Sequence, residues 1–212
     1  MMKISKLLVE EGVLTFGDFT LKSGRKAPYF LNFGNIKTGK SISELSDFYS
    51  EILIKNVDLK NRILFGPAYK GIPLVVAVAF SLIGKGFNVP FCYNRKEAKD
   101  HGERGSLVGA VPKAGDKITV IEDVMTAGTA LRETMKLEGF EESVDSCIIA
   151  VDRMERGKSK ESAVKEMERE FGIKIYSISN IRDIVDDLYE SGQIQIQTKS
   201  GIEDYLKEFR GE

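Results

Sequence analysis

The sequence has few cysteines, no excess of either charge and no long apolar run. Its 212 residues include two cysteines, Cys92 and Cys147, which are too few for a disulfide framework or a cysteine-based zinc site. Lys and Arg number 31 against 32 Asp and Glu, so the formal charge is −1. This balance does not favour a chain that coats nucleic acid.

The apolar segments are also too short for a membrane protein. The longest, residues 72–83, contains Pro73 and Ser81, whereas a helix needs about 20 apolar residues to cross a bilayer. Acidic residues interrupt the N-terminal segment MMKISKLLVEEG, where a signal peptide requires an unbroken apolar stretch. We therefore expect a reduced, soluble, cytoplasmic protein without membrane contacts.

Five short apolar runs predict buried parallel strands. They are mostly β-branched, continuous rather than alternating, and bounded by Gly, Pro or charge, as in strands covered on both faces. These runs are residues 62–65, 89–93, 117–121, 144–151 and 174–178. Helix-like segments lie between or beside them, at residues 42–54, 72–85, 127–138, 159–171, 181–189 and 202–209. Such alternation predicts an α/β fold with an open parallel sheet flanked by helices.

The N-terminal third has a different pattern. Residues 15–33 alternate and turn at Ser23-Gly24, which predicts a β-hairpin. We expect one domain over residues 1–212, with about 1–40 forming a small N-terminal hood and about 60–180 forming the α/β core.

The clearest chemical signal is the segment 119–131, TVIEDVMTAGTAL. An apolar strand ends there in two carboxylates, Glu122 and Asp123, and a loop of small and hydroxyl residues precedes a helix. Ligands of open parallel sheets bind beyond the carboxyl ends of the strands, and the N–H groups of such a loop can hold a phosphate. Carboxylates repel phosphate, so the acid pair should face sugar hydroxyls or a metal. A ribose 5-phosphate fits both the acid pair, through its hydroxyls, and the loop, through its phosphate. The alternative is an ordinary strand-turn-helix whose acidic residues are solvated.

Two further segments carry basic residues at strand ends. Residues 94–105, NRKEAKDHGERG, hold the only histidine beside Gly102 and Gly105, which is the composition of a mobile lid. A solvated loop is the alternative, because three acidic residues nearly cancel the charge. Residues 64–72, LFGPAYKGI, could place an ammonium and backbone N–H groups on a pyrophosphate, or could form a simple turn with a surface lysine.

These segments together resemble a known family. Segment 119–131 resembles the phosphoribosyl pyrophosphate (PRPP) motif of type I phosphoribosyltransferases, whose acid pair binds the ribose hydroxyls and whose loop binds the 5′-phosphate. The other two segments resemble the catalytic loop and the pyrophosphate segment of orotate phosphoribosyltransferases. The resemblance implies catalytic roles for Lys99, His101 and Asp123. It also implies that PRPP contacts Lys22, Tyr69, Lys70, Arg95, Lys96, Lys99, His101, Glu122, Asp123, Val124, Met125, Thr126, Ala127, Gly128, Thr129 and Ala130.

The base site is implied by two more segments of the same family. Residues 16–34 resemble its hood, and residues 152–157, DRMERG, resemble the stretch whose arginine contacts orotate. The implied orotate contacts are Lys22, Phe30, Leu31, Thr126 and Arg153. The family often has a second aromatic residue where this chain has Leu31. A planar guanidinium such as that of Arg153 can hold a carboxylate in a bidentate fork, although a surface ion pair with Asp152 or Glu155 is the alternative.

The resemblance implies the transfer of a phosphoribosyl group from PRPP to orotate, giving orotidine 5′-phosphate and pyrophosphate in pyrimidine (UMP) synthesis. Magnesium would be the cofactor, held mainly through PRPP and water rather than by protein ligands. Family enzymes are homodimers in which the catalytic loop reaches the neighbouring active site. We expect no nucleic-acid partner.

The sequence leaves three other interpretations open. A phosphoribosyltransferase for a purine or uracil would share segment 122–130 but would not explain Arg153 and Lys22. A PRPP-responsive regulator that binds RNA or DNA would need a basic face, yet residues 152–212 carry 11 basic and 14 acidic residues. Residues 34–41 match the P-loop pattern G-x-x-x-x-G-K-[ST], although the strand before them alternates like a hood strand rather than a buried central one.

Overall fold

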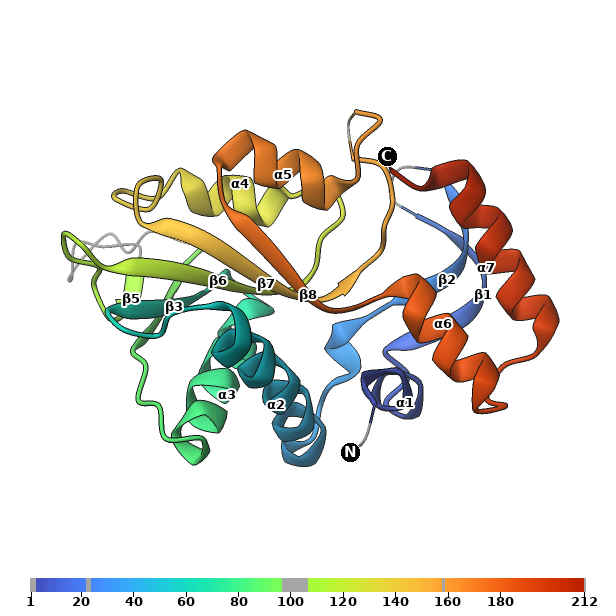
Figure 1. Cartoon of the computed structure of the whole chain (residues 1–212), viewed down its shortest axis with the longest axis horizontal. Coiled ribbons are helices and arrows are strands. Elements are labelled where there is room, and N and C mark those ends of the chain that lie inside the picture. The colour runs from blue at the N-terminus through green and yellow to red at the C-terminus, as the bar shows by residue number, and fades with distance from the viewer. Residues whose placement is uncertain (1–2, 22–23, 97–106, 158, 212) are drawn as a thin grey trace.

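The computed structural model describes residues 3–21, 24–96, 107–157 and 159–211. Its centre is a six-stranded sheet in the order β5-β4-β3-β6-β7-β8, with helices on both faces (Figure 1). The strands are β3 (Arg62–Gly66), β4 (Phe91–Asn94), β5 (Leu107–Gly109), β6 (Lys117–Val124), β7 (Val144–Asp152) and β8 (Lys174–Asn180). All neighbouring pairs are parallel except β4 and β5. Each of the five predicted strands is therefore confirmed. The antiparallel edge strand β5 was not predicted, because three residues are too few to show a period.

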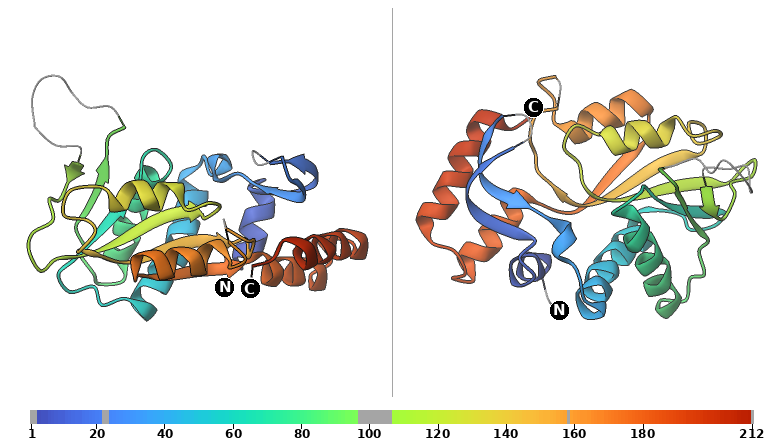
Figure 2. Two further views of the ribbon diagram at one scale, coloured as in Figure 1. Left: turned by 90° about the horizontal axis from the view of Figure 1, so that it is seen from above. Right: turned by 180° about the vertical axis from the view of Figure 1, so that it is seen from behind.

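The continuous apolar runs are explained by burial on both faces of the sheet. Leu64 packs into the core on the side of α2 (Gly39–Asn56) and α3 (Gly71–Gly84). Its neighbours Ile63 and Phe65 point the other way, into the core on the side of α4 (Thr129–Met135) and α5 (Ala163–Phe171). Figure 2 shows these two helix layers from further directions.

The predicted N-terminal hairpin is confirmed as a separate two-stranded antiparallel sheet. It consists of β1 (Leu14–Thr20) and β2 (Lys26–Leu31), preceded by α1 (Ile4–Glu10) and followed by a short 3-10 helix, η1 (Phe33–Asn35). Two C-terminal helices, α6 (Ile181–Glu190) and α7 (Ile196–Phe209), pack against this region, α6 on α1 and α7 on β2. The first helix and the last two helices thus lie together with the hairpin, beyond strand β8 of the core sheet (Figure 1).

The segment that matches the P-loop pattern connects the hood to the core. Thr38 caps α2, and its side chain and that of Ser41 each accept a hydrogen bond from the other's backbone N–H. The side chain of Lys40 is 84% exposed and lies 3.9 Å from Glu44. The capping box occupies the Ser41 N–H and hydroxyl, which in a P-loop would serve the nucleotide and its metal. No helix in the described part of the chain is both long and apolar enough to cross a membrane.

Candidate active site

Three of the segments that the sequence singled out for chemistry follow the carboxyl ends of core strands. The loop after β3 contains Tyr69 and Lys70, and β6 and β7 end in Glu122-Asp123-Val124 and in Asp152. Since these strands are parallel, their carboxyl ends meet at one edge of the sheet, where open α/β sheets bind ligands. The structure therefore brings the PRPP segment and the predicted base segment to one edge.

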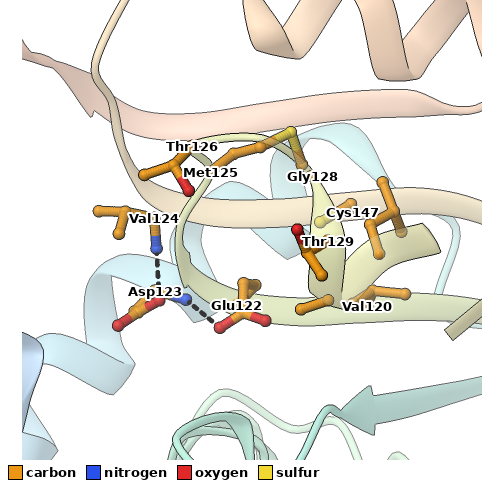
Figure 3. A pocket seen from close by; sticks show the side chains of 11 residues that line it. Val120, Glu122, Asp123, Val124, Met125, Thr126, Gly128, Thr129 and Cys147 are labelled. Atoms are coloured by element: carbon orange, nitrogen blue, oxygen red, sulfur yellow. Dashed lines mark hydrogen bonds between the residues drawn. The ribbon is translucent and has the colours of Figure 1, made fainter. Parts of the chain in front are cut away.

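The acid pair is the charged centre of this edge. Asp123 is 5% exposed, and its Oδ1 accepts a hydrogen bond from the N–H of Val124 at 2.7 Å. The N–H of Asp123 in turn donates to Glu122 Oε1 at 3.0 Å (Figure 3). Lys70 Nζ lies 3.0 Å from Asp123 Oδ2, so the ammonium neutralises this carboxylate.

Burial, and after it the charge of the neighbouring Asp123 carboxylate, raise the pKa of Glu122 from 4.5 to about 8. A protonated Glu122 is the expected outcome for a buried acid that lies beside a second carboxyl group. Ribose hydroxyls, which can donate to both oxygens of a carboxylate, are the partners expected to favour ionisation of Glu122. The acid pair is thus suited to a neutral polyol and not to an anion.

The loop after β6 encloses a cavity of about 230 Å³. Its lining residues are Val120, Glu122, Asp123, Val124, Met125, Thr126, Gly128, Thr129, Ala130, Leu131 and Cys147. The Thr126 and Thr129 side chains lie on this loop (Figure 3), and no side chain of the described residues caps the first turn of α4. Hydroxyls and uncapped N–H groups around such a space can bind a phosphate.

Gly128 is required by the shape of this loop. Its φ of +67° is a left-handed conformation that side chains rarely adopt. A Cβ atom there would also lie 2.3 Å from the sulfur of the buried Met167 on α5. Both the backbone conformation and the packing against Met167 thus require glycine at position 128.

The loop after β3, which carries the predicted pyrophosphate residues, lies beside the residues that follow β4. The Ala68 N–H donates to Asn94 Oδ1 at 2.8 Å, which ties the two loops together. Lys96 Nζ lies 5.3 Å from the centre of the Tyr69 ring, within cation–π range. Lys70, Lys96 and the neighbouring Arg95 thus place three cations at this edge, and Lys70 already faces Asp123.

Arg153 occupies the opposite part of the edge, where the core meets the hood. It is 4% exposed, and its guanidinium carbon lies 4.6 Å from the centre of the Tyr29 ring. Its ion pair with Glu155, at 2.6 Å, is the pairing that the sequence offered as an alternative to ligand binding. The pair is buried rather than on the surface, because Glu155 is itself only 11% exposed.

Phe30 and Leu31 are adjacent in β2, so they point to opposite faces. Phe30 is 41% exposed and stacks on Phe19, with ring centres 5.6 Å apart. Leu31 is 6% exposed and packs in the hydrophobic core. The Phe30 side chain is therefore available to a ligand, whereas Leu31 can offer one only its backbone.

Lys22, Lys99 and His101 lie outside the described residues. The sequence offered Glu155 only as a surface partner of Arg153, and among the described residues it missed Arg25 and Tyr29, which contact this buried pair. Tyr29 appears in the sequence as one of several alternating hairpin residues, and Arg25 as one of three basic residues near its turn. Nothing in their local pattern indicates that they meet a residue more than 120 positions away.

Comparison with known proteins agrees with this geometry. Residues 32–178 match the phosphoribosyl transferase domain family. The chain belongs to this family and, within it, to the orotate phosphoribosyltransferases.

The orotate phosphoribosyltransferase of Clostridium acetobutylicum is 46% identical, over 96% of this chain and 95% of its own. That of Pseudomonas putida is 44% identical, over 96% and 95%. The structure of the Francisella tularensis enzyme superposes with a TM-score of 0.84 at 36% identity and covers 99% of both chains. The predicted fold class and family are thus confirmed.

Proposed function

We propose that the protein transfers the 5-phosphoribosyl group from PRPP to orotate, giving orotidine 5′-phosphate and pyrophosphate for pyrimidine nucleotide synthesis. The observation that carries the proposal is the pairing of two sites on one sheet edge. The Glu122–Ala130 segment suits a ribose 5-phosphate, and the buried Arg153 beside the hood suits an acidic base. The near full-length likeness to orotate phosphoribosyltransferases supports the same substrates.

Catalysis in this site rests on positioning and charge. Departure of pyrophosphate leaves positive charge at C1′ of the ribose, as in glycoside transfer. Glu122 and Asp123 hold the ribose hydroxyls, and the loop with Thr126 and Thr129 holds the 5′-phosphate. When PRPP binds, Lys70 leaves its ion pair with Asp123 and contacts the pyrophosphate instead. The positive charge of Lys70 there stabilises the leaving group. Burial raises the pKa of the Cys147 thiol, which lines the cavity, so this group stays protonated and is no nucleophile.

The acid pair also fits the proposed magnesium cofactor. The described residues contain no group of three or more His, Cys, Asp or Glu side chains able to enclose a metal. Two adjacent carboxylates and a phosphorylated substrate suit Mg²⁺, which keeps several waters and takes few protein ligands. When bound with PRPP, Mg²⁺ supplies further neutralisation of the pyrophosphate. Glu122 and Asp123 are the residues that would hold it, directly or through the ribose hydroxyls.

A panel of bases tests the function. With PRPP and Mg²⁺, we expect loss of orotate, measured by its ultraviolet absorbance, and no loss of uracil, adenine or hypoxanthine. Consumption of a purine or uracil with orotate untouched would show that the acceptor base is not orotate. PRPP-dependent binding of RNA or DNA without turnover of any base would favour a regulator instead.

We also propose a homodimer with shared active sites. An apolar stripe on α3 supports it, because Val76, Phe80 and Ile83, at helical spacing, are 42%, 78% and 58% exposed. The helix α3 follows Tyr69 and Lys70 directly, so a second copy seated on this stripe would lie on an element that leads from the site. The free, buried cysteines Cys92 and Cys147 are consistent with the reducing cytoplasm that we propose as its location.

Hybrid dimers test the sharing. If Lys99 serves the partner's site while Asp123 serves its own, Lys99→Ala and Asp123→Ala homodimers should both be nearly inactive. Mixing them should form hybrids with one intact site each, and random pairing should restore about a quarter of wild-type activity. No recovery, with hybrids present by native mass spectrometry, would exclude the shared site.

A further inference from the structure

Arg153 has only part of its guanidinium free for a ligand. Its Nε and Nη2 both donate to one oxygen of Glu155, Oε1, at 3.0 and 2.6 Å. The remaining terminal nitrogen, Nη1, makes no hydrogen bond to any described residue. The Nε–Nη2 side of the fork is therefore already taken by Glu155, which leaves the Nη1 end for a ligand.

Glu155 is in turn held from the hood. The Tyr29 hydroxyl donates to Glu155 Oε1 at 2.9 Å, and Arg25 Nη1 donates to Oε2 at 3.1 Å. The Tyr29 ring also lies against the Arg153 guanidinium, so one hood residue contacts both members of the pair. Rotation of the Glu155 carboxylate would break contacts with two residues of the hairpin.

The backbone around Glu155 is fixed as well. Met154 has a φ of +58°, and its N–H donates to Asp152 Oδ1 at 2.7 Å, which forms a tight turn. The backbone then pairs with the C-terminal segment, through Arg156 N–H to Phe209 O at 2.9 Å and Gly211 N–H to Met154 O at 3.0 Å. The carboxylate of Glu155 is thus anchored by its side chain and by its main chain.

We propose that Glu155 is a positioning residue for base recognition: it holds the Nε–Nη2 edge of Arg153 so that the Nη1 end faces the orotate. This inference rests on the proposed function and deepens it. Glu155 makes no contact with substrate in this role and acts only through Arg153. A lysine at 153 could not be oriented in this way, because its ammonium has no fixed edge.

A purely structural role is the competing explanation. In that case Glu155 would only join the hood to the core through Arg25 and Tyr29. Its loss would then lower stability or the active fraction, and would affect both substrates alike. The positioning role instead predicts an effect on orotate and not on PRPP.

The test compares the KM values of the two substrates in Glu155→Ala, Arg153→Lys and the double variant. Glu155→Ala should raise the KM for orotate by roughly tenfold or more and that for PRPP by less than about threefold, where tenfold corresponds to one lost interaction of ordinary strength. The double variant should match Arg153→Lys, since Glu155 has nothing left to position. Equal changes in both KM values, or effects that multiply in the double variant, would overturn the proposal.

Two milder variants keep the test decisive if Glu155→Ala does not fold. Glu155→Gln retains an oxygen that faces Arg153, so its KM for orotate should be much closer to the wild-type value than that of Glu155→Ala. Tyr29→Phe removes one anchor of Glu155 but keeps the ring under Arg153, so it should raise the orotate KM by a smaller factor. A Tyr29→Phe enzyme whose PRPP KM rises as much as its orotate KM would contradict the proposal.

The matched control is Glu161→Gln, a glutamate six residues further along whose partner is the exposed Arg169. It should leave both KM values unchanged. The wild-type rate with orotate tests the proposed function. The role of Glu155 is tested by the KM for the base in each variant relative to wild type, measured with whichever base the wild type consumes.

Discussion

The phosphate end and the base end of the site are built in different ways. At the phosphate end, the carboxylates, hydroxyls and backbone groups come almost entirely from one continuous segment, Glu122–Leu131, with Lys70 added from the next loop. At the base end, the surroundings of Arg153 come from the hairpin, from the turn after β7 and from the C-terminal helix. The first end is therefore local in sequence and the second is assembled by the fold.

This difference decides what the sequence could predict. A strand ending in Glu122-Asp123 and followed by Thr126 and Gly128 carries its geometry in its own spacing, so the strand, the loop and their place at the sheet edge could be predicted. The ligand that they bind stays a prediction. At the base end, Glu155 could be named as a partner of Arg153 because it lies two residues away in the chain. The contacts of Arg25 and Tyr29 with this pair could not be predicted, because they form only when the hairpin packs on the core. The five core strands were found for the same local reason, through their apolar runs, whereas the short strand β5 depends on pairing with β4.

The largest expected effect lies at the phosphate end. Asp123→Asn keeps the shape of the side chain but removes the charge that faces Lys70 and the ribose. Loss of one group that acts mainly in the transition state typically lowers turnover by roughly 10²–10³. Steady-state rates with saturating PRPP would measure this, with a circular dichroism spectrum to verify folding. Turnover within threefold of wild type would show that the acid pair has no ribose role.

The pH dependence of PRPP binding would sharpen the comparison further. Because burial and Asp123 raise the pKa of Glu122 to about 8, PRPP must displace a proton when it engages the ionised carboxylate. Affinity for PRPP should therefore rise with pH between 6.5 and 8.5, by up to about tenfold per unit. Titration calorimetry in buffers of different ionisation enthalpy would detect the released proton. Glu122→Gln should abolish this release. An unchanged pH profile in that variant would show that the released proton comes from another group.

The same group links pH to stability. An acid whose folded pKa is raised favours the folded state when protonated, and this contribution is lost as the pH rises through the folded value. For Glu122 the window runs from its ordinary value of 4.5 to about 8. Glu122→Gln should melt at a higher temperature than the wild type at pH 9, with a smaller difference at pH 5.

A smaller effect is expected from the support of the base end. The Phe209 ring lies 4.7 Å from the Arg25 guanidinium carbon, and Arg25 holds Glu155. Phe209→Ala should raise the KM for orotate by a few-fold, about the loss of one cation–π contact, while the KM for PRPP stays unchanged. If PRPP binding weakens equally, the two ends are not separable as the structure suggests.

No effect at all is expected from Lys40→Ala. The side chain is 84% exposed, and its nearest acid is Glu44, so nothing connects it to either end of the site. Turnover and both KM values should remain within error of wild type. Loss of phosphate binding in a folded Lys40→Ala protein would revive the P-loop interpretation of residues 34–41.

The pairing of residues 209–211 with residues 154–156 also has a consequence for the order in which the site forms during synthesis. The sheet is complete once Asn180 has been made, so the phosphate end can fold while the rest of the chain is still being added. The turn that carries Arg153 and Glu155 must wait for the last helix before its backbone is paired. Since domains fold as the chain emerges at about 5–20 residues per second, a nascent chain spends seconds able to form one half of its site but not the other.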